Sequence, residues 1–237
     1  MLARVLSSAV FGIEAFTVEV EVDIANGLPA FNIVGLPDTA CRESLDRVRA
    51  AVKNSGIPFP AKKITVNLAP ANIKKEGSGF DLAIAIGILI ANENISKEAV
   101  EGKVFCGELS LDGKVRPISG VLPRASHLAW DGPNELYLPA QNSKEALCVE
   151  GIKVFGLRSL TDLLRHLKGE LRLESESFVP QEKKERVGDF LCVGYRENNR
   201  RPKEGTKTKK TKYPSIYLLL REENNYDCEK KASIPIQ

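Results

Sequence analysis

Ser78 is the residue whose type and position could make it a nucleophile in this sequence. It lies in the glycine turn Gly77-Ser78-Gly79, after two lysines and directly before a long apolar stretch. A serine with a desolvated lysine close to it can attack an acyl group, because the lysine then acts as a general base. The candidate base is Lys74, Lys75 or Lys114. The alternative, which we favour, is that Ser78 caps the following helix and the lysines are solvated.

Asp81 is the second residue here that could carry chemistry. It lies in the first turn of the expected helix, where a carboxylate complements the helix dipole, and we favour this structural role. A catalytic or ligand role would require a polar partner. The candidate partners are Asn67, Asn72 and Arg124.

Nucleotide and metal sites are not expected. A helix that begins after a glycine turn can bind phosphate, but the sequence contains no GxxxxGK[ST] motif, and the run KTKKT from Lys207 lacks the necessary glycine. The histidines, His127 and His166, are isolated from each other. The five cysteines are scattered without a CxxC pair, which indicates thiols rather than a zinc site or a disulfide framework. We therefore expect no cofactor and no metal in this chain.

The basic character of the chain lies near its C-terminus. From Val179 onward there are fourteen Lys or Arg and nine Asp or Glu, whereas the residues before it carry a slight acidic excess. The run from Arg196 to Lys212 has eight basic residues, two acids and no aromatic side chain. It could bind nucleic-acid phosphate without base stacking, or it could be a solvated tail. Its candidate contact residues are Arg200, Arg201, Lys207, Lys209 and Lys210.

Elements that would position Ser78 and Asp81 can be identified from periodicity. Val18, Val20, Val22 and Ile24 alternate with acidic residues, which predicts a strand with one wet face. Phe80 to Ala91 is apolar nearly all round, which predicts a helix buried between layers. Further strands are predicted at 2–11, 30–34, 63–68, 104–109, 114–118, 135–138 and 153–155, with the opening strands up to residue 34 forming a hairpin or meander. Further helices are predicted at 39–55, which Asp38 can cap, and at 122–130, 143–149 and 159–167. Interleaved strands and helices indicate an α/β or α+β layered fold.

Domain boundaries and location follow from composition. We expect a folded domain over residues 1–175 and an aperiodic, disordered basic tail over 176–237. The N-terminus lacks a signal-peptide pattern, and the longest apolar run, Leu82 to Ala91, is about half of what spans a bilayer. A soluble cytoplasmic protein without membrane contact is the expectation.

Several stretches together resemble one protein family. They are GLPAFNIVGLPDTACRESLDRVRAAVKNSG, KITVNLAPANIKKEGSGFDLAIAIGIL, GELSLDGKVRPISGVLP and LPAQNSKEA, in this order between residues 27 and 146. They resemble the N-terminal domain of the magnesium-chelatase-like AAA+ ATPases, the YifB/ComM family of bacterial competence proteins. The resemblance covers residues 2 to 168.

This resemblance implies a fold similar to the second domain of ribosomal protein S5 and to the Lon proteolytic domain. Lon-like enzymes use a serine in a KDGPSAG-type stretch and a lysine after a PIGGLK-type stretch. In this sequence the serine position falls on Gly79, with Ser78 one place early, and the lysine position falls on Leu122. Leucine cannot accept a proton from serine, so the resemblance implies a lost catalytic dyad.

The resemblance also sets expectations for partners. Family members carry a downstream ATPase domain, which would bind ATP and Mg²⁺, and ComM-type members form hexameric rings that bind DNA and drive branch migration during natural transformation. Here the basic tail follows instead, which suggests truncation or a shifted reading frame soon after Pro180. We therefore expect a non-catalytic module with possible DNA contact and self-association. A residual Ser–Lys peptidase and a DNA-binding fragment acting through the tail are the alternatives.

Overall fold

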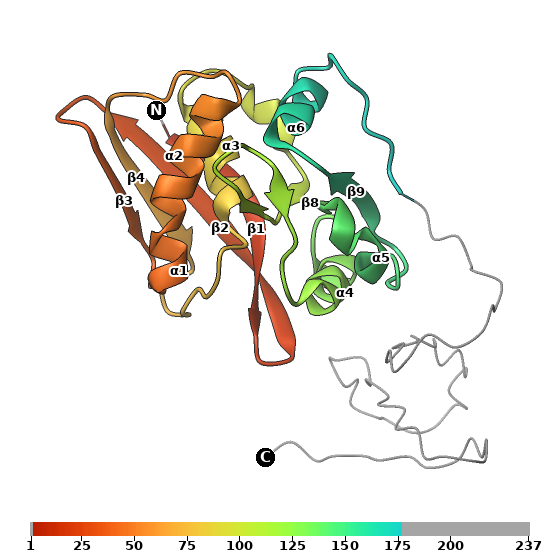
Figure 1. Ribbon diagram of the computed structural model, residues 1–237. Helices are drawn as coiled ribbons and strands as arrows, with labels where there is room; N and C mark the ends of the chain where they lie inside the picture. Colours follow the sequence, from red (N-terminus) through yellow and green to blue (C-terminus); the bar gives the residue numbers. More distant parts are fainter. Residues whose placement is uncertain (1, 177–237) are drawn as a thin grey trace, which may run out of the picture. The chain divides into compact units, whose positions relative to one another are not determined.

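The computed structural model describes residues 2–176, and within them seven strands form one mixed sheet (Figure 1). The order across the sheet is β3-β4-β2-β1-β5-β8-β9. A separate two-stranded hairpin, β6-β7, lies apart from it. The strands are β1 (Leu2–Phe11), β2 (Glu14–Ala25), β3 (Ala30–Val34), β4 (Lys63–Ala69), β5 (Lys103–Phe105), β6 (Glu108–Leu109), β7 (Val115–Arg116), β8 (Glu135–Pro139) and β9 (Lys153–Leu157).

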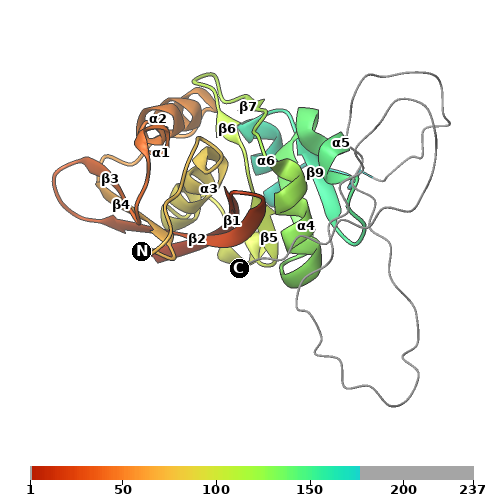
Figure 2. The ribbon, with the colours of Figure 1, turned by 90° about the horizontal axis from the view of Figure 1, so that it is seen from below.

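The helices divide between the two faces of the sheet. They are α1 (Thr39–Arg42), α2 (Ser44–Asn54), α3 (Asp81–Ala91), α4 (Val121–Asp131), α5 (Ser143–Ala146) and α6 (Leu160–Leu167), with short 3₁₀ turns at Lys97–Val100 and Ala140–Asn142. Helix α3 lies between α2 and the strands β1 and β2 (Figure 2). Helices α3 and α6 pack in the same apolar cluster, whereas α4 and α5 pack in a second cluster.

The N-terminal strands follow their predicted periodicity. Val18, Val20, Val22 and Ile24 are buried, and β2 pairs antiparallel with β1 through a hairpin that joins Phe11 to Glu14. The hairpin of β1 and β2 agrees with the prediction, but β3 does not extend it into a meander. Instead, β3 pairs in parallel with β4. The reason is that α1 and α2 separate β3 from β4 in the chain, and such a crossover favours parallel pairing.

Helix α3 is buried along its whole length, as its uniform apolar character predicts. Its side chains contact β1 and β2 on one side and α2 on the other. Burial on all sides places Asp81, the first residue of α3, inside the domain rather than at its surface.

The other predicted strands and helices are present, but their ends differ from the predicted ones. The strand expected over 104–109 is divided into β5 and β6, because the chain bends at Cys106 and Gly107 and leaves the main sheet. The helix expected over 143–149 ends at Ala146. The mixed α/β architecture agrees with the predicted fold class, whereas the predicted disordered basic tail lies outside the described residues.

Within residues 2–176, no helix is both long and apolar enough to cross a membrane.

Candidate functional site

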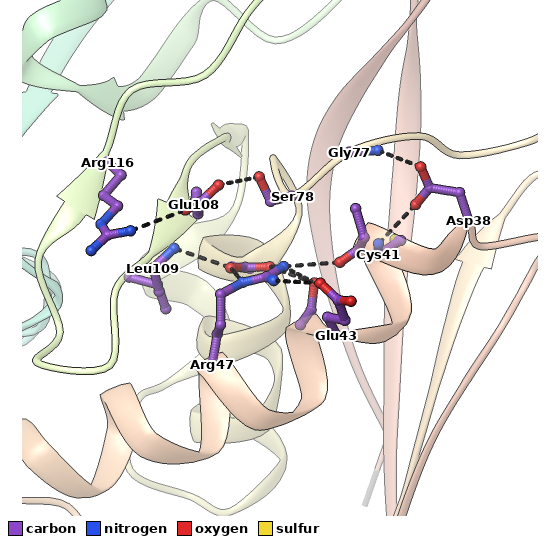
Figure 3. Close-up of polar contacts among 12 residues, drawn as sticks. Asp38, Cys41, Glu43, Arg47, Gly77, Ser78, Glu108, Leu109 and Arg116 are labelled. Atoms are coloured by element: carbon purple, nitrogen blue, oxygen red, sulfur yellow. Dashed lines mark hydrogen bonds and ion pairs between the residues drawn. The ribbon is translucent and has the colours of Figure 1, made fainter.

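The turn that carries Ser78 is held against the loop before α1. The Lys75 amide donates to Leu36 O at 3.1 Å, and the Asp38 amide donates to Lys75 O at 3.0 Å. One oxygen of Asp38 accepts from the Cys41 amide at 2.7 Å, which caps α1 as predicted, and the other accepts from the Gly77 amide at 3.0 Å (Figure 3). Asp38 therefore fixes the start of α1 and the glycine turn together.

Ser78 donates its hydroxyl proton to Glu108 on the small hairpin. Arg116, on the paired strand, lies 3.7 Å from the other oxygen of the same carboxylate (Figure 3). The expected role of Ser78 as a helix cap is wrong, because α3 has Phe80 at its N-cap position and no side-chain cap. Instead, the Ser78 hydroxyl is bound by the carboxylate of Glu108, because the β6-β7 hairpin lies next to the glycine turn.

Lys75 is fully buried and points to backbone carbonyls. Its Nζ donates to Pro70 O and, at 2.8 Å, to Ile73 O. Burial lowers the pKa of Lys75, because the charged form is removed from water. The expectation that the lysines are solvated is therefore wrong for Lys75. Its hydrogen bonds tie the loop after β4 to the glycine turn.

Lys74 and Lys114 are exposed and pair with nearby acids. Lys74 Nζ lies 2.8 Å from Glu76 and Lys114 Nζ lies 2.8 Å from Asp112. Within residues 2–176, no hydrogen bond joins Ser78 to any of the three candidate lysines, and each lysine has another partner. The structure gives no contact that would pair Ser78 with a base of this kind.

Asp81 is the centre of a buried polar network. Its carboxylate accepts from Ser44 Oγ, from Arg47 Nε at 2.7 Å and from the Leu109 amide at 3.1 Å (Figure 3). None of these donors is Asn67, Asn72 or Arg124, the candidate partners for a catalytic or ligand role of Asp81. Ser44 and Arg47 lie on α2, far from Asp81 in the sequence, and they reach it because α2 packs on α3.

Charge and burial compete in this network. Burial raises the pKa of Asp81, and this effect exceeds the lowering by its hydrogen bonds with Arg47 and Ser44. The same hydrogen bond with Asp81 raises the pKa of Arg47. Cys41, which is also buried nearby, has its pKa raised to about 12, first by burial and then by the charges of Asp38 and Asp81. A thiol in this state is a poor nucleophile.

The stretch that follows the small hairpin lies against Gly79. A Cβ atom built on Gly79 would lie 3.5 Å from Nη2 of Arg124 and 3.8 Å from Cδ1 of Ile118. Leu122 donates its amide proton to Glu145 at 2.9 Å. Sequence reasoning missed the proximity of Arg124 to Gly79, because no local pattern connects residues 45 positions apart.

Each histidine is hydrogen-bonded to another side chain. His127 Nε2 lies 3.1 Å from Thr17 Oγ1, and His166 Nε2 lies 3.1 Å from Tyr137 Oη. Within residues 2–176 no group of three or more His, Cys, Asp or Glu side chains could hold a metal ion. The candidate tail contacts, from Arg200 to Lys210, lie outside the described residues.

A basic pocket lies beside α2, and no local pattern in the sequence predicts it. It has a volume of about 250 Å³, and its lining includes Arg49, Lys53 and Lys62 together with Phe59. The Arg49 guanidinium stacks over the Phe59 ring at 5.6 Å. Among the residues that line this pocket there is no acidic side chain. The cations come from α2 and from the loop before β4, so only the fold brings them together.

Comparison with known proteins identifies a matching family model and several relatives. The family model for subunit ChlI of Mg-chelatase matches residues 20–142. An uncharacterized protein of Mycobacterium tuberculosis is 43% identical over 192 residues, which is 81% of this chain and 38% of that protein. The competence protein ComM of Haemophilus influenzae is 40% identical over 181 residues, which is 76% of this chain and 35% of that protein.

A more distant relative bears on the fold. Lon protease 2 of Bacillus subtilis is 25% identical over 186 residues, covering 72% of this chain and 33% of the protease. The chain thus spans between about a third and two fifths of the length of these relatives. The mixed sheet with its covering helices is consistent with a Lon-like α/β domain.

Proposed function

This chain belongs to the family of subunit ChlI of Mg-chelatase, and from that premise we propose that its folded domain is a non-catalytic module of a ComM-type AAA+ ATPase. In this role the domain supports assembly of the ATPase ring and its contact with DNA during branch migration. ATP and Mg²⁺ are bound by the ATPase domain of such proteins and not by this one. Self-association and DNA contact are the interactions that this function requires.

The proposal rests on which residues stand at the two positions where Lon-like enzymes carry their catalytic serine and lysine. By resemblance to the Lon-like motifs, the serine position falls on Gly79 and the lysine position on Leu122. Ser78, the only nearby hydroxyl on the glycine turn, donates to Glu108, and Lys75 is engaged by two backbone carbonyls. A Ser–Lys mechanism requires the lysine within hydrogen-bond reach of the serine, and neither side chain is directed that way.

A peptidase assay tests the non-catalytic assignment. We expect no hydrolysis of unstructured protein or fluorogenic peptide above background, and no difference between the wild-type chain and Ser78→Ala. Hydrolysis that disappears in Ser78→Ala and persists in the exposed-residue control Ser126→Ala would establish the peptidase alternative. An ATPase and nucleotide-binding assay on the same preparation is the second arm, and tight ATP binding would contradict the module assignment.

DNA contact by the domain itself is favoured by the basic pocket. Arg49, Lys53 and Lys62 present positive charge without an acid in the pocket lining, which suits contact with nucleic-acid phosphate. Electrostatic binding of this kind weakens with salt, because each neutralised phosphate releases counterions. This pocket offers a DNA contact that does not depend on the basic tail.

Charge-neutralising variants distinguish the pocket from the tail. We expect the double variant Lys53→Gln/Lys62→Gln to bind single-stranded DNA more weakly and to lower the slope of log K against log salt by about 1–2. The matched control is Lys97→Gln/Lys144→Gln, which removes two exposed lysines elsewhere in the domain. A deletion of residues 196–212 tests the tail alternative. Loss of binding in that deletion alone, with the pocket variant unchanged, would assign DNA contact to the tail.

A further inference from the structure

His166, near the end of α6, contacts the last described segment of the chain. This segment comprises residues 170–176, and we call it the strap. The Leu173 amide donates to Nδ1 of His166 at 3.1 Å, and the carbonyl oxygen of Leu171 lies 3.3 Å from the same nitrogen. One ring nitrogen therefore faces a backbone donor and a backbone acceptor at once.

The far end of the strap lies on the outer edge of the main sheet. The Glu176 amide donates to Val154 O at 2.7 Å, and Ser143 Oγ donates to the Glu176 carboxylate at 2.8 Å. Val154 belongs to β9, which is the last strand in the order of the sheet. Nearer to α6, Leu173 packs on the apolar cluster that contains α3 and α6. The strap is thus attached to the domain at His166, through Leu173 and at β9.

The proton on Nδ1 decides which backbone group the His166 ring can bind. A nitrogen without a proton accepts from the Leu173 amide, whereas a protonated nitrogen donates to Leu171 O. Nε2 lies 3.1 Å from Tyr137 Oη, so the ring that accepts from Leu173 carries its proton on Nε2 and donates it to Tyr137. A charged imidazole is a donor at both nitrogens. It keeps the bond to Tyr137 but cannot accept from Leu173.

Aromatic neighbours fix the position of the His166 ring. Its centroid lies 5.8 Å from that of Tyr137 and 6.1 Å from that of Phe155. Burial raises the pKa of Tyr137, so its hydroxyl stays neutral and remains available to Nε2. Protonation of His166 therefore changes what Nδ1 binds rather than where the ring lies.

Charged side chains face His166 from each element that packs around it. They line the same pocket as the ring and are Lys103 of β5, Glu135 of β8, Lys153 of β9 and, on the strap, Arg172 and Glu174. On α6 itself, Asp162 lies one turn before His166 and is hydrogen-bonded to Ser159. Among these types of side chain, only an imidazole ordinarily changes its charge between pH 5 and pH 8. The ring of His166 is half-buried, so a proton can reach it from water.

We propose that His166 is a pH-sensitive latch for the strap, in which the neutral ring binds the Leu173 amide and the protonated ring releases it. In the protonated form two N–H groups face each other, and the Leu173 amide loses its acceptor. Because the closed latch requires the neutral ring, it is present above the midpoint of the histidine titration and is lost as the pH falls through it. This regulation does not depend on the proposed function, since it involves neither the basic pocket nor the glycine turn.

Amide hydrogen exchange in the full chain, measured by NMR at about pH 8 and about pH 5, tests the latch on both sides of the usual histidine titration. After correction for the intrinsic exchange rate, the protection of the Leu173 amide is expected to fall about twofold to tenfold at the lower pH, as for the loss of one hydrogen bond. The Glu176 amide is expected to lose protection with it. The Lys168 amide, bonded to Leu164 O at the end of α6, is expected to keep its protection.

Three outcomes of this experiment would contradict the latch. Unchanged protection at Leu173 would overturn the proposal outright. A loss confined to Leu173, with Glu176 unchanged, would show that the strap is not released. An equal loss at Lys168 would show that the end of α6 frays, and that the ring does not act on the strap alone.

Two single variants assign the change to His166, because the chain has only two histidines. His166→Phe keeps an aromatic ring against Tyr137 but has no nitrogen, so Leu173 protection is expected to be low at both pH values. His127→Asn, the control, removes the other histidine and is expected to keep the pH dependence of the wild-type chain. A pH dependence that persists in His166→Phe, or that disappears in His127→Asn, would rule out His166 as the latch.

The ring nitrogens of the wild-type chain give a test that needs no variant. The ¹⁵N chemical shift of Nδ1 reports whether that nitrogen carries a proton. We expect Nδ1 of His166 to be unprotonated at about pH 8 and to gain its proton with the same midpoint at which Leu173 loses protection. A proton on Nδ1 at about pH 8, or two separate midpoints, would overturn the proposal.

Discussion

Asp81 determines how the polar interior of the domain is arranged. It is fully buried, and donors from α2 and from the small hairpin converge on its carboxylate. Arg47, whose side chain is 19% exposed, supplies the compensating charge. A buried ion pair gives little net stability compared with apolar residues, but breaking one by removing a single partner leaves an uncompensated charge. The network therefore specifies how α2, α3 and the hairpin meet.

Asp81→Asn is expected to destabilise the domain strongly. The change preserves shape but leaves Arg47 with only the exposed Glu43, 3.8 Å away, as a charge partner. It also turns an amide NH₂ group toward other donors, so the unfolding free energy should fall by about 3 kcal/mol. Urea denaturation followed by circular dichroism measures the loss. The control is Asp112→Asn, which removes an exposed partner of Lys114 and should change stability little. Similar losses in both variants would contradict a special role for Asp81.

Lys75 should make the free energy of unfolding depend on pH in the alkaline range. Burial lowers its pKa, so between that lowered pKa and the unfolded value of about 10.4 the unfolded chain binds more protons than the folded one. Unfolding free energy contributed by Lys75 therefore rises with pH across this window. Measured as the difference between wild type and Lys75→Met, which cancels other titrating groups, stability should increase as the pH rises toward the unfolded value of about 10.4. A flat or falling difference would show that the folded protein does not penalise the charged lysine.

At the scale of elements, α3 is the helix on which both neighbouring layers pack. Gly87, near the middle of α3, approaches β2 so closely that a Cβ atom there would lie 2.5 Å from Cγ2 of Val22. Glycine inside a helix is disfavoured by about 1 kcal/mol relative to alanine, so this glycine is explained by packing and not by helix propensity. The close approach of α3 to the sheet depends on it.

Gly87→Ala is expected to destabilise the domain by about 1–3 kcal/mol in spite of its better helix propensity. The clash is with Val22, so the double variant Gly87→Ala/Val22→Ala should lose less than the sum of the two single variants. A double-mutant cycle by chemical denaturation measures this coupling. Additive losses would show that the alanine methyl group is accommodated without pressing on β2.

At the scale of the whole folded domain, two apolar clusters lie on opposite faces of one sheet. The larger cluster contains α3 and the buried faces of β2 and β4, and the smaller contains α4 with alternate residues of β5, β8 and β9. Because β1 pairs with both β2 and β5, the hydrogen bonds of the sheet connect the strands beneath the two clusters. We infer that neither cluster persists when the other is lost.

Shortening a buried side chain in either cluster should therefore lower the midpoint of one and the same unfolding transition. Leu68→Ala in the larger cluster and Leu138→Ala in the smaller are each expected to lose about 2–5 kcal/mol, with both fully buried leucines leaving a cavity. Far-UV circular dichroism and the fluorescence of Trp130 on α4 should report coincident midpoints in each variant. Separate midpoints after Leu138→Ala alone would show that the α4 layer unfolds independently.

Much of the local structure could be predicted from residues close in the chain. Alternation over Val18 to Ile24 identified β2, the uniform apolar run identified α3, and Asp38 and Ser159 were correctly expected to begin helices. These features are recognisable because strand and helix periodicity, and capping by a side chain, depend on neighbours within a few positions. The family motifs likewise indicated the α/β fold and the family.

Partners across the fold were decided only by the tertiary structure. Asp81 could be seen to need a donor, but Ser44 and Arg47 reach it only because α2 packs on α3. The glycine turn could be recognised from the sequence as a possible active-site turn. Its neighbours in the fold, Glu108 and Arg124, lie on a hairpin and a helix about thirty and forty-five residues further along the chain. Contacts of this kind are set by how layers pack, which local periodicity does not specify, and so the sequence determined the elements while the fold determined the site.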